Sequence, residues 1–185
     1  MLEKNIEIAF LKEIEFQCQV IVSSCNDLAI NIKSDDVIHC WALIQSILFA
    51  CTNISKIFCP PTPRDKSLID ECNERGEYLK KKLSIKKSSY LLFGYLRDDV
   101  EHFDERLHIW AKASNDILAN RNIGSLRFVH MDNPSERSDM ENFDPNTFIL
   151  TFWEKEFPIK EIFVESTRLL INTQNNIRKL TSFYS

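Results

Sequence analysis

Glycine and proline are scarce in this chain of 185 residues, which contains 3 glycines and 6 prolines. An all-β or loop-rich protein would need more of both, because tight turns depend on these residues. The shortage therefore favours a helical protein. The scattered glycines also form no glycine-rich loop that could cradle a phosphate, and no nucleophile elbow.

The sequence contains no recognisable metal-binding motif. Its 6 cysteines all lie in the first half of the chain, without a Cys-x-x-Cys pair and without zinc spacing to any histidine. Most of them fall on apolar stripes, where free cysteine behaves as a small buried hydrophobe. We therefore expect reduced core thiols, no bound metal and no cofactor.

Positive charge and long hydrophobic runs are also lacking. The net charge of -4 gives no overall footprint for nonspecific nucleic-acid binding, so any RNA site must be a local basic patch. The longest apolar stretch, Trp41–Cys51, is interrupted by Gln45 and Ser46 and is too short to span a bilayer. Residues 1–4 lead into an amphipathic pattern rather than a secretion signal. We expect a cytoplasmic protein with no membrane partner.

Apolar residues recur at three- and four-residue steps through most of the chain, which is the pattern of amphipathic helices. Pro158 lies near the start of the last of these segments, where proline is well tolerated. The predicted helices cover Glu3–Ile32, Ser34 or Asp35 to Phe58, Asp65–Leu83, Tyr90–Ser114, and a final segment from about Pro158 to Leu180.

The segment before the last helix has a different pattern. Leu126–His130 and Thr147–Trp153 are rich in β-forming residues and flank a polar loop, Asp132–Pro145. We expect a β-hairpin or a three-stranded flap over about residues 126–157. Without internal repeats or linkers, residues 1–185 are predicted to form a single domain. The predicted fold is mainly α, a bundle of about five helices with a small β-hairpin insert before the last helix.

Residues 97–102, Arg-Asp-Asp-Val-Glu-His, carry the chemistry that is easiest to interpret. An imidazole can take a proton from a ribose 2′-hydroxyl or give one to the leaving 5′-oxygen. A guanidinium binds phosphate oxygens and stabilises the charge of the transition state. His102 and Arg97 are therefore candidate catalytic residues for metal-independent RNA cleavage, with Asp98 or Asp99 orienting one of them.

Arg97 and His102 are expected to lie about 140° apart around the helix axis, because they are five residues apart. His102 then belongs to a strip of mixed aromatic, aliphatic and charged residues, which suits a surface packed against a partner. Two copies of the helix across a two-fold axis would bring both pairs into one cleft, so we expect a homodimer. The strip contains Tyr95, Asp99, His102, Arg106 and Ile109.

An ordinary solvent-exposed helix would show the same residues. Asp98 and His102, like Arg97 and Glu101, are i,i+4 neighbours, and such pairs contribute only ~0.2–0.5 kcal/mol each. The spacing alone therefore does not separate a catalytic pair from a salt-bridged surface.

Five lysines within eight positions precede this helix. They could follow a phosphate backbone into the cleft, with Arg106 as a further RNA contact. Alternatively, they are cations at a helix end that offset its dipole. The lysines are Lys80, Lys81, Lys82, Lys86 and Lys87.

An arginine, a polar residue, three further residues and a histidine within a helical bundle resemble the motif of the HEPN superfamily. Residues 39–45 and 96–106 also resemble uncharacterised bacterial HEPN-like proteins. The resemblance covers the helices up to Ser114 and the last helix, but not the β insert. It implies a metal-independent endoribonuclease of a toxin–antitoxin, antiphage or RNA-processing system. Arg97 and His102 would form the catalytic pair at a dimeric composite site, with Asp98 in the polar position.

The resemblance leaves a second hypothesis open, because some members of the superfamily have lost activity and serve as binding modules. The chain could then be a catalytically inactive helical dimerisation or interaction module. HEPN toxins that pair with a nucleotidyltransferase antitoxin often carry a tyrosine two residues after the histidine, where this chain has Asp104. Silencing by modification at that position is therefore not implied. RNA and an antitoxin or other partner protein remain the expected partners.

Overall fold

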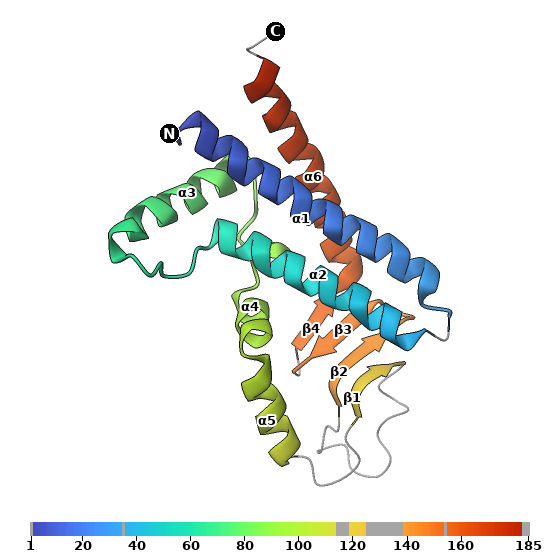
Figure 1. Ribbon diagram of the computed structural model, residues 1–185. Helices are drawn as coiled ribbons and strands as arrows, with labels where there is room; N and C mark the ends of the chain where they lie inside the picture. Colours follow the sequence, from blue (N-terminus) through green and yellow to red (C-terminus); the bar gives the residue numbers. More distant parts are fainter. Residues whose placement is uncertain (1, 35, 114–118, 125–138, 154, 183–185) are drawn as a thin grey trace.

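The computed structural model describes residues 2–34, 36–113, 119–124, 139–153 and 155–182. Over these residues the chain is mainly helical, as predicted, with a small sheet before the last helix (Figure 1). The elements are α1 (Lys4–Asn31), α2 (Val37–Phe58), η1 (Lys66–Leu68), α3 (Ile69–Lys82), η2 (Tyr90–Leu92), α4 (Gly94–Glu101), α5 (Phe103–Ala113), β1 (Ala119–Ile123), β2 (Asp139–Asp144), β3 (Ile149–Phe152), β4 (Lys155–Pro158) and α6 (Ile159–Thr181).

The helix α1 packs along both α2 and α6 and supplies much of the core (Figure 1). The carboxylate of Asp36 caps α2 by accepting a hydrogen bond from the backbone N–H of His39 at 2.9 Å. The helix ends at Phe58, shortly before Pro60, which has no amide donor. All six cysteines are free thiols, and four are buried, which confirms the expected reduced core thiols at Cys18, Cys25, Cys40 and Cys51.

The predicted helix over Tyr90–Ser114 is wrong as a single rod, because the structure divides it into η2, α4 and α5. The first break is at Phe93, whose φ of -63° and ψ of 98° lie outside the helical region. The start of η2, before this break, is anchored by a contact with α6. The carboxylate of Glu165 accepts hydrogen bonds from the Ser89 hydroxyl at 2.5 Å and from the Tyr90 backbone N–H at 3.0 Å. The second break is at His102, whose φ of -106° and ψ of 32° end α4. The described residues therefore contain six α-helices rather than about five.

The sheet is larger than the predicted hairpin. It has the strand order β1-β2-β3-β4, with β1 parallel to β2 and the other pairs antiparallel. It begins at Ala119, ahead of the predicted start at residue 126. The predicted strand Thr147–Trp153 corresponds to β3, which pairs with β4, a strand that the sequence did not indicate. The predicted strand Leu126–His130 lies outside the described residues.

Part of the predicted polar loop Asp132–Pro145 is a strand. Residues 139–144 form β2, in which Met140 and Phe143 are buried and the polar Glu141 and Asn142 are also buried. These polar side chains have partners on β1, because Glu141 pairs with Arg121 and Asn142 accepts a hydrogen bond from Asn122. The loop prediction failed because the Glu141 carboxylate and the Asn142 amide oxygen accept hydrogen bonds from a strand 20 positions away, which the local sequence pattern does not reveal.

The sheet lies between α5 and α6, below α2 in the view of Figure 1. Aromatic rings fix it to the helices: Phe103 of α5 stacks on Phe152 of β3 with ring centroids 6.4 Å apart. Phe93, just before α4, meets Phe157 of β4 edge-on at the same separation. The strands β3 and β4 thus form part of the packed interior and position the α4–α5 region that carries the arginine and histidine.

Candidate functional site

Arg97 lies on α4 and binds the end of α2. Its Nη1 donates a hydrogen bond to the backbone carbonyl of Cys59 at 3.1 Å, and its Nε lies 3.4 Å from the Asp98 carboxylate. The carbonyls at the C-terminal end of a helix lack intrahelical partners and carry partial negative charge, so a guanidinium stabilises them. Arg97 therefore has a structural role, and its side chain remains 21% exposed.

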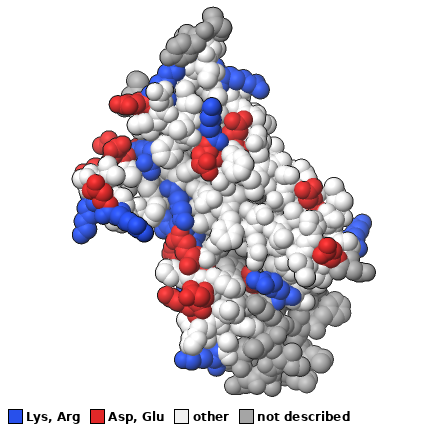
Figure 2. All heavy atoms as spheres, in the orientation of Figure 1, with Lys and Arg blue, Asp and Glu red and all other residues white. Residues whose placement is uncertain are grey.

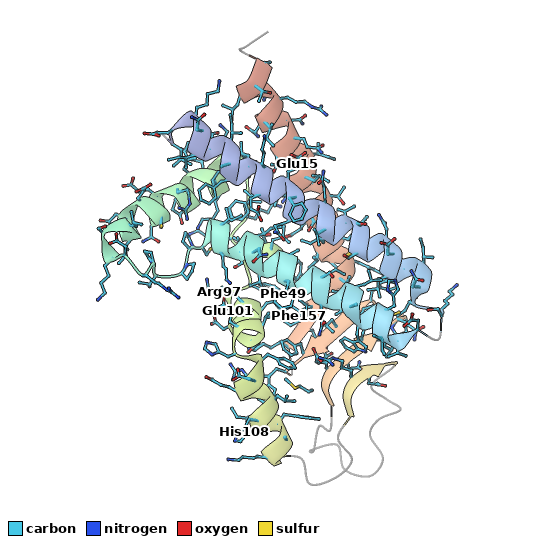
Figure 3. The ribbon with its side chains drawn as sticks, in the orientation of Figure 1. Glu15, Phe49, Arg97, Glu101, His108 and Phe157 are labelled. Carbon is cyan, nitrogen blue, oxygen red and sulfur yellow. The ribbon has the colours of Figure 1, made fainter. Side chains whose placement is uncertain are left out.

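A second charged contact runs beside the first. Lys56 of α2 forms an ion pair with Glu101, one turn after Arg97 on α4. Figure 3 shows Arg97 and Glu101 next to each other on α4, below α2, with His108 farther along α5. The two contacts hold the short α4 against the C-terminal end of α2.

His102 lies in the break between α4 and α5 rather than in the middle of a helix. Its side chain is 57% exposed, and its Nδ1 lies 3.5 Å from the Glu105 carboxylate. Asp98 is also exposed, on α4. The structure therefore presents Asp98 and His102 to solvent and leaves Arg97 partly accessible, but none of the three lines either of the two cavities described below.

The strip predicted to face a partner is partly covered by the chain itself. Asp99 is fully buried, and its Oδ2 accepts a hydrogen bond from Lys155 of β4 at 2.7 Å. Nη2 of Arg106 forms an ion pair with Asp99 Oδ1 at 3.1 Å, and the same guanidinium lies over the Trp153 ring. At these positions the strip packs on the sheet of its own chain. Arg106, predicted as an RNA contact, is thus already paired with a carboxylate.

The five predicted lysines divide into two groups. Lys82 pairs with the buried Glu7, and Lys80 pairs with Glu77. Burial alone would lower the pKa of Lys82, but its contacts with Glu7 and Tyr78 raise this pKa above its ordinary value. The exposed members are Lys81, Lys86 and Lys87. Of the five predicted lysines, only these three are exposed and available for phosphate contacts.

A cavity that the sequence did not indicate lies where α2, the α4–α5 break and the sheet meet. Its volume is about 170 Å³. Its walls are mostly apolar, and its polar lining comes from Gln45 on α2 and from Arg121 and Glu141 on the sheet. The lining residues are Gln45, Leu48, Phe49, Val100, Phe103, Arg121, Glu141 and Phe152.

Glu141 and Arg121 are neighbours in the register of β1 and β2. Nε of Arg121 donates a hydrogen bond to Oε2 of Glu141 at 2.9 Å, and the Glu141 side chain is only 4% exposed. Burial raises the pKa of this carboxyl, and the Arg121 charge partly opposes the change. The pair was missed because its residues are 20 positions apart, and their opposite charges become informative only once the strand register is known.

A second hollow, of about 430 Å³, lies between α1 and α2. Phe16 of α1 and Phe49 of α2 border it and are both more than half exposed. The adjoining stretches, Phe16–Asn26 and Val37–Ser55, contain no aspartate, glutamate, lysine or arginine. Figure 2 shows the resulting uncharged surface across the middle of these two helices. We call it the neutral α1–α2 face.

Among the described helices, α2 is the one that is long and apolar enough to cross a membrane by length and composition. Half of its most apolar stretch is buried inside the fold. Because the core helix of a globular protein meets the same criterion, α2 gives only weak support to a membrane role.

No family model, curated protein or solved structure matches this chain. Among the described residues, no group of three or more histidine, cysteine, aspartate or glutamate side chains could hold a metal ion. Evidence for a function therefore comes from the geometry around Arg97 and His102 and from the resemblance of residues 97–102 to the HEPN motif.

Proposed function

We propose that this chain is a HEPN-like, metal-independent endoribonuclease that acts in the cytoplasm as a homodimer, in toxin–antitoxin or antiphage defence. The observation that supports the proposal is the accessibility of Asp98 and His102 beside the partly exposed Arg97. Because these groups lie on an open surface, a second copy would be needed to enclose an RNA strand. Pairing across a two-fold axis would supply the same groups from both copies.

In the proposed reaction, His102 removes the proton from a ribose 2′-hydroxyl, and the oxygen attacks the adjacent phosphorus. The bond to the 5′-oxygen breaks, and this oxygen receives a proton from an imidazole, leaving a 2′,3′-cyclic phosphate and a free 5′-hydroxyl. Arg97 stabilises the negative charge on the nonbridging oxygens of the pentacoordinate phosphorus. Its Nη2 has no hydrogen-bond partner in the described part of the chain, and Asp98 holds Nε on the other side.

The test is RNA cleavage in the presence of EDTA. We expect His102→Ala to lower cleavage by about 10²-fold or more, the scale of one general acid–base residue. His108→Ala is the matched control, because His108 is an exposed histidine on the neighbouring helix. Equal cleavage by both variants would indicate a contaminating nuclease and refute the proposal.

The Arg97 experiment must separate a catalytic role from the structural contact with Cys59. Arg97→Ala removes both the phosphate clamp and the contact with Cys59, whereas Arg97→Lys keeps the positive charge but not the forked geometry. If Arg97 is catalytic, cleavage should fall in both variants while the melting temperature of Arg97→Lys stays near that of the wild type. A loss of cleavage that simply follows the loss of folding would indicate a structural residue.

A second candidate function is a catalytically inactive dimerisation or interaction module. The neutral α1–α2 face favours it, because large apolar side chains such as Phe16 and Phe49 are exposed there beside a hollow. The contact of Arg97 with Cys59 would then account for the arginine without catalysis. A partner protein such as an antitoxin, or a second copy, would bind this face, and the protein would cleave no RNA.

A further inference from the structure

The cavity between α2, the α4–α5 break and the sheet has the size of one ring system. Its volume of about 170 Å³ corresponds to the liquid volume of about five or six water molecules. Drug-sized ligands occupy larger pockets, of about 300–1,000 Å³. Three phenylalanines, Phe49, Phe103 and Phe152, line it together with aliphatic side chains, and such walls suit the apolar faces of a flat ring.

The buried carboxylate of Glu141 gives the cavity a hydrogen-bonding end. Its Oε2 is held by Arg121, while its Oε1 has no hydrogen-bond partner among the described residues. The acceptor oxygens of a buried carboxylate are normally satisfied by donors. Because Glu141 lines the cavity, a ligand bound there can supply such a donor. Because Arg121 is held through Nε, its Nη groups can donate to an acceptor placed next to Glu141.

The charges at this end select the kind of ligand. A cationic ligand would face the guanidinium of Arg121, and an anionic ligand would face the carboxylate of Glu141, so both are disfavoured. A neutral ligand with an N–H donor beside an acceptor can bind both side chains at once. The edges of nucleobases have this arrangement, and their faces stack on aromatic side chains.

We propose that this cavity binds a flat, neutral heterocycle that carries an N–H donor beside an acceptor, as in an unpaired nucleobase. The donor hydrogen-bonds to Oε1 of Glu141, the acceptor binds a guanidinium N–H of Arg121, and the ring lies between the phenylalanines. The cavity is built partly from the β insert and does not involve Arg97 or His102. It therefore goes beyond the proposed ribonuclease site, and only the idea that the base belongs to an RNA strand rests on that function.

The experiment is binding of guanosine, adenosine, cytidine and uridine to the full chain, measured by saturation-transfer NMR and titration calorimetry. We expect at least one nucleoside to bind through its base protons, whereas ribose alone does not bind. A single-stranded oligonucleotide forms a second arm of the test. Tighter binding of the oligonucleotide, in competition with the nucleoside, identifies an RNA base as the ligand, and equal or weaker binding identifies a free nucleoside or base.

Two variants test the geometry. In Glu141→Gln, the amide oxygen is needed to accept the hydrogen bond from Nε of Arg121. The amide NH₂ then faces the cavity, where it places a second donor opposite the N–H donor of the ligand. We expect at least about tenfold weaker binding. Val100→Phe fills the cavity without changing its polar end and should also abolish binding. Val164→Phe, on the exposed side of α6, is the matched control.

Circular dichroism of each variant separates lost binding from lost folding. The inference is overturned if no nucleoside binds to the wild type, or if a folded Val100→Phe protein binds as well as the control. Nucleoside binding without RNA cleavage would support the ligand proposed for this cavity and refute the ribonuclease proposal. Cleavage that depends on His102, without nucleoside binding, would support the ribonuclease proposal and refute the ligand proposed for the cavity.

Discussion

At the scale of single residues, burial changes what a side chain can do. Glu141, Asp99 and Glu7 are almost fully buried carboxylates, and each has a cationic partner from another element. From the sequence, each reads as an ordinary surface acid, because nothing in a local pattern reveals a partner 20 to 75 positions away. The side chains of His102 and Asp98, by contrast, are exposed and remain accessible to a ligand.

Glu141 should make the stability of the protein depend on pH. Burial raises the pKa of this carboxyl above its ordinary value of 4.5. The folded state therefore holds the proton more tightly than the unfolded state, and this contribution to stability is present at low pH and lost as pH rises through the folded pKa. Glutamine does not titrate, so only the wild type should lose this contribution between pH 4 and pH 7. We therefore expect the decrease in the free energy of unfolding caused by Glu141→Gln to be smaller at pH 7 than at pH 4. Urea unfolding at the two pH values measures the difference, and a larger cost at pH 7 would contradict the assigned direction.

At the scale of elements, periodicity predicted the helices whose stability comes from a continuous apolar face. The predicted and observed bounds of α1, α2 and α6 agree closely, because each helix buries a regular stripe such as Ile14, Cys18 and Ile21. The predictions failed where a contact with a distant element overrides local pattern. Glu165 anchors the start of η2, and the Arg121–Glu141 pair lies in a strand where the sequence predicted a loop.

Asp99 joins three elements and should be important for stability. It lies on α4, pairs with Arg106 of α5 and Lys155 of β4, and is fully buried. Asp99→Ala would leave two cations without their carboxylate, although both cations are about one-third exposed, which limits the cost. We expect a loss of about 2 kcal/mol in the free energy of unfolding, measured with urea at neutral pH.

The neighbouring Asp98 provides the control for this prediction. Its side chain is exposed, so Asp98→Ala should change stability by no more than about 0.5 kcal/mol. Similar losses in the two variants would mean that burial does not distinguish these positions. The comparison also matters for catalysis, because Asp98 belongs to the proposed ribonuclease site and Asp99 supports the fold.

At the scale of the whole molecule, the neutral α1–α2 face is the surface best suited to pairing of two copies. The projecting Phe16 and Phe49 lie beside a hollow lined by Ala42, Ser46 and Ala50. A two-fold axis could place the rings of one copy in the hollow of the other, which is the self-complementarity that an isologous interface requires. The absence of charge over this face means that pairing would bury no unpaired ion.

Phe16→Glu tests this surface. The side chain is more than half exposed, so the substitution should leave folding intact while placing a charge in the interface. We expect a dimer in the wild type and a monomer in the variant by light scattering coupled to size-exclusion chromatography.

Val164→Glu is the matched control for that experiment, because Val164 is also exposed but lies on α6. It should remain dimeric. A dimer that survives Phe16→Glu would place the pairing surface elsewhere, and binding of the wild type to lipid vesicles instead of self-association would indicate a membrane contact through α2.

Gln45 and Phe49 line both the hollow on the α1–α2 side and the cavity beneath α2. One short stretch of helix thus forms the wall between two compartments, and a shift of the Phe49 ring changes the shape of both. The two binding events are then thermodynamically linked. If a small molecule in the cavity changes the dimerisation constant by some factor, dimerisation changes the affinity for that small molecule by the same factor.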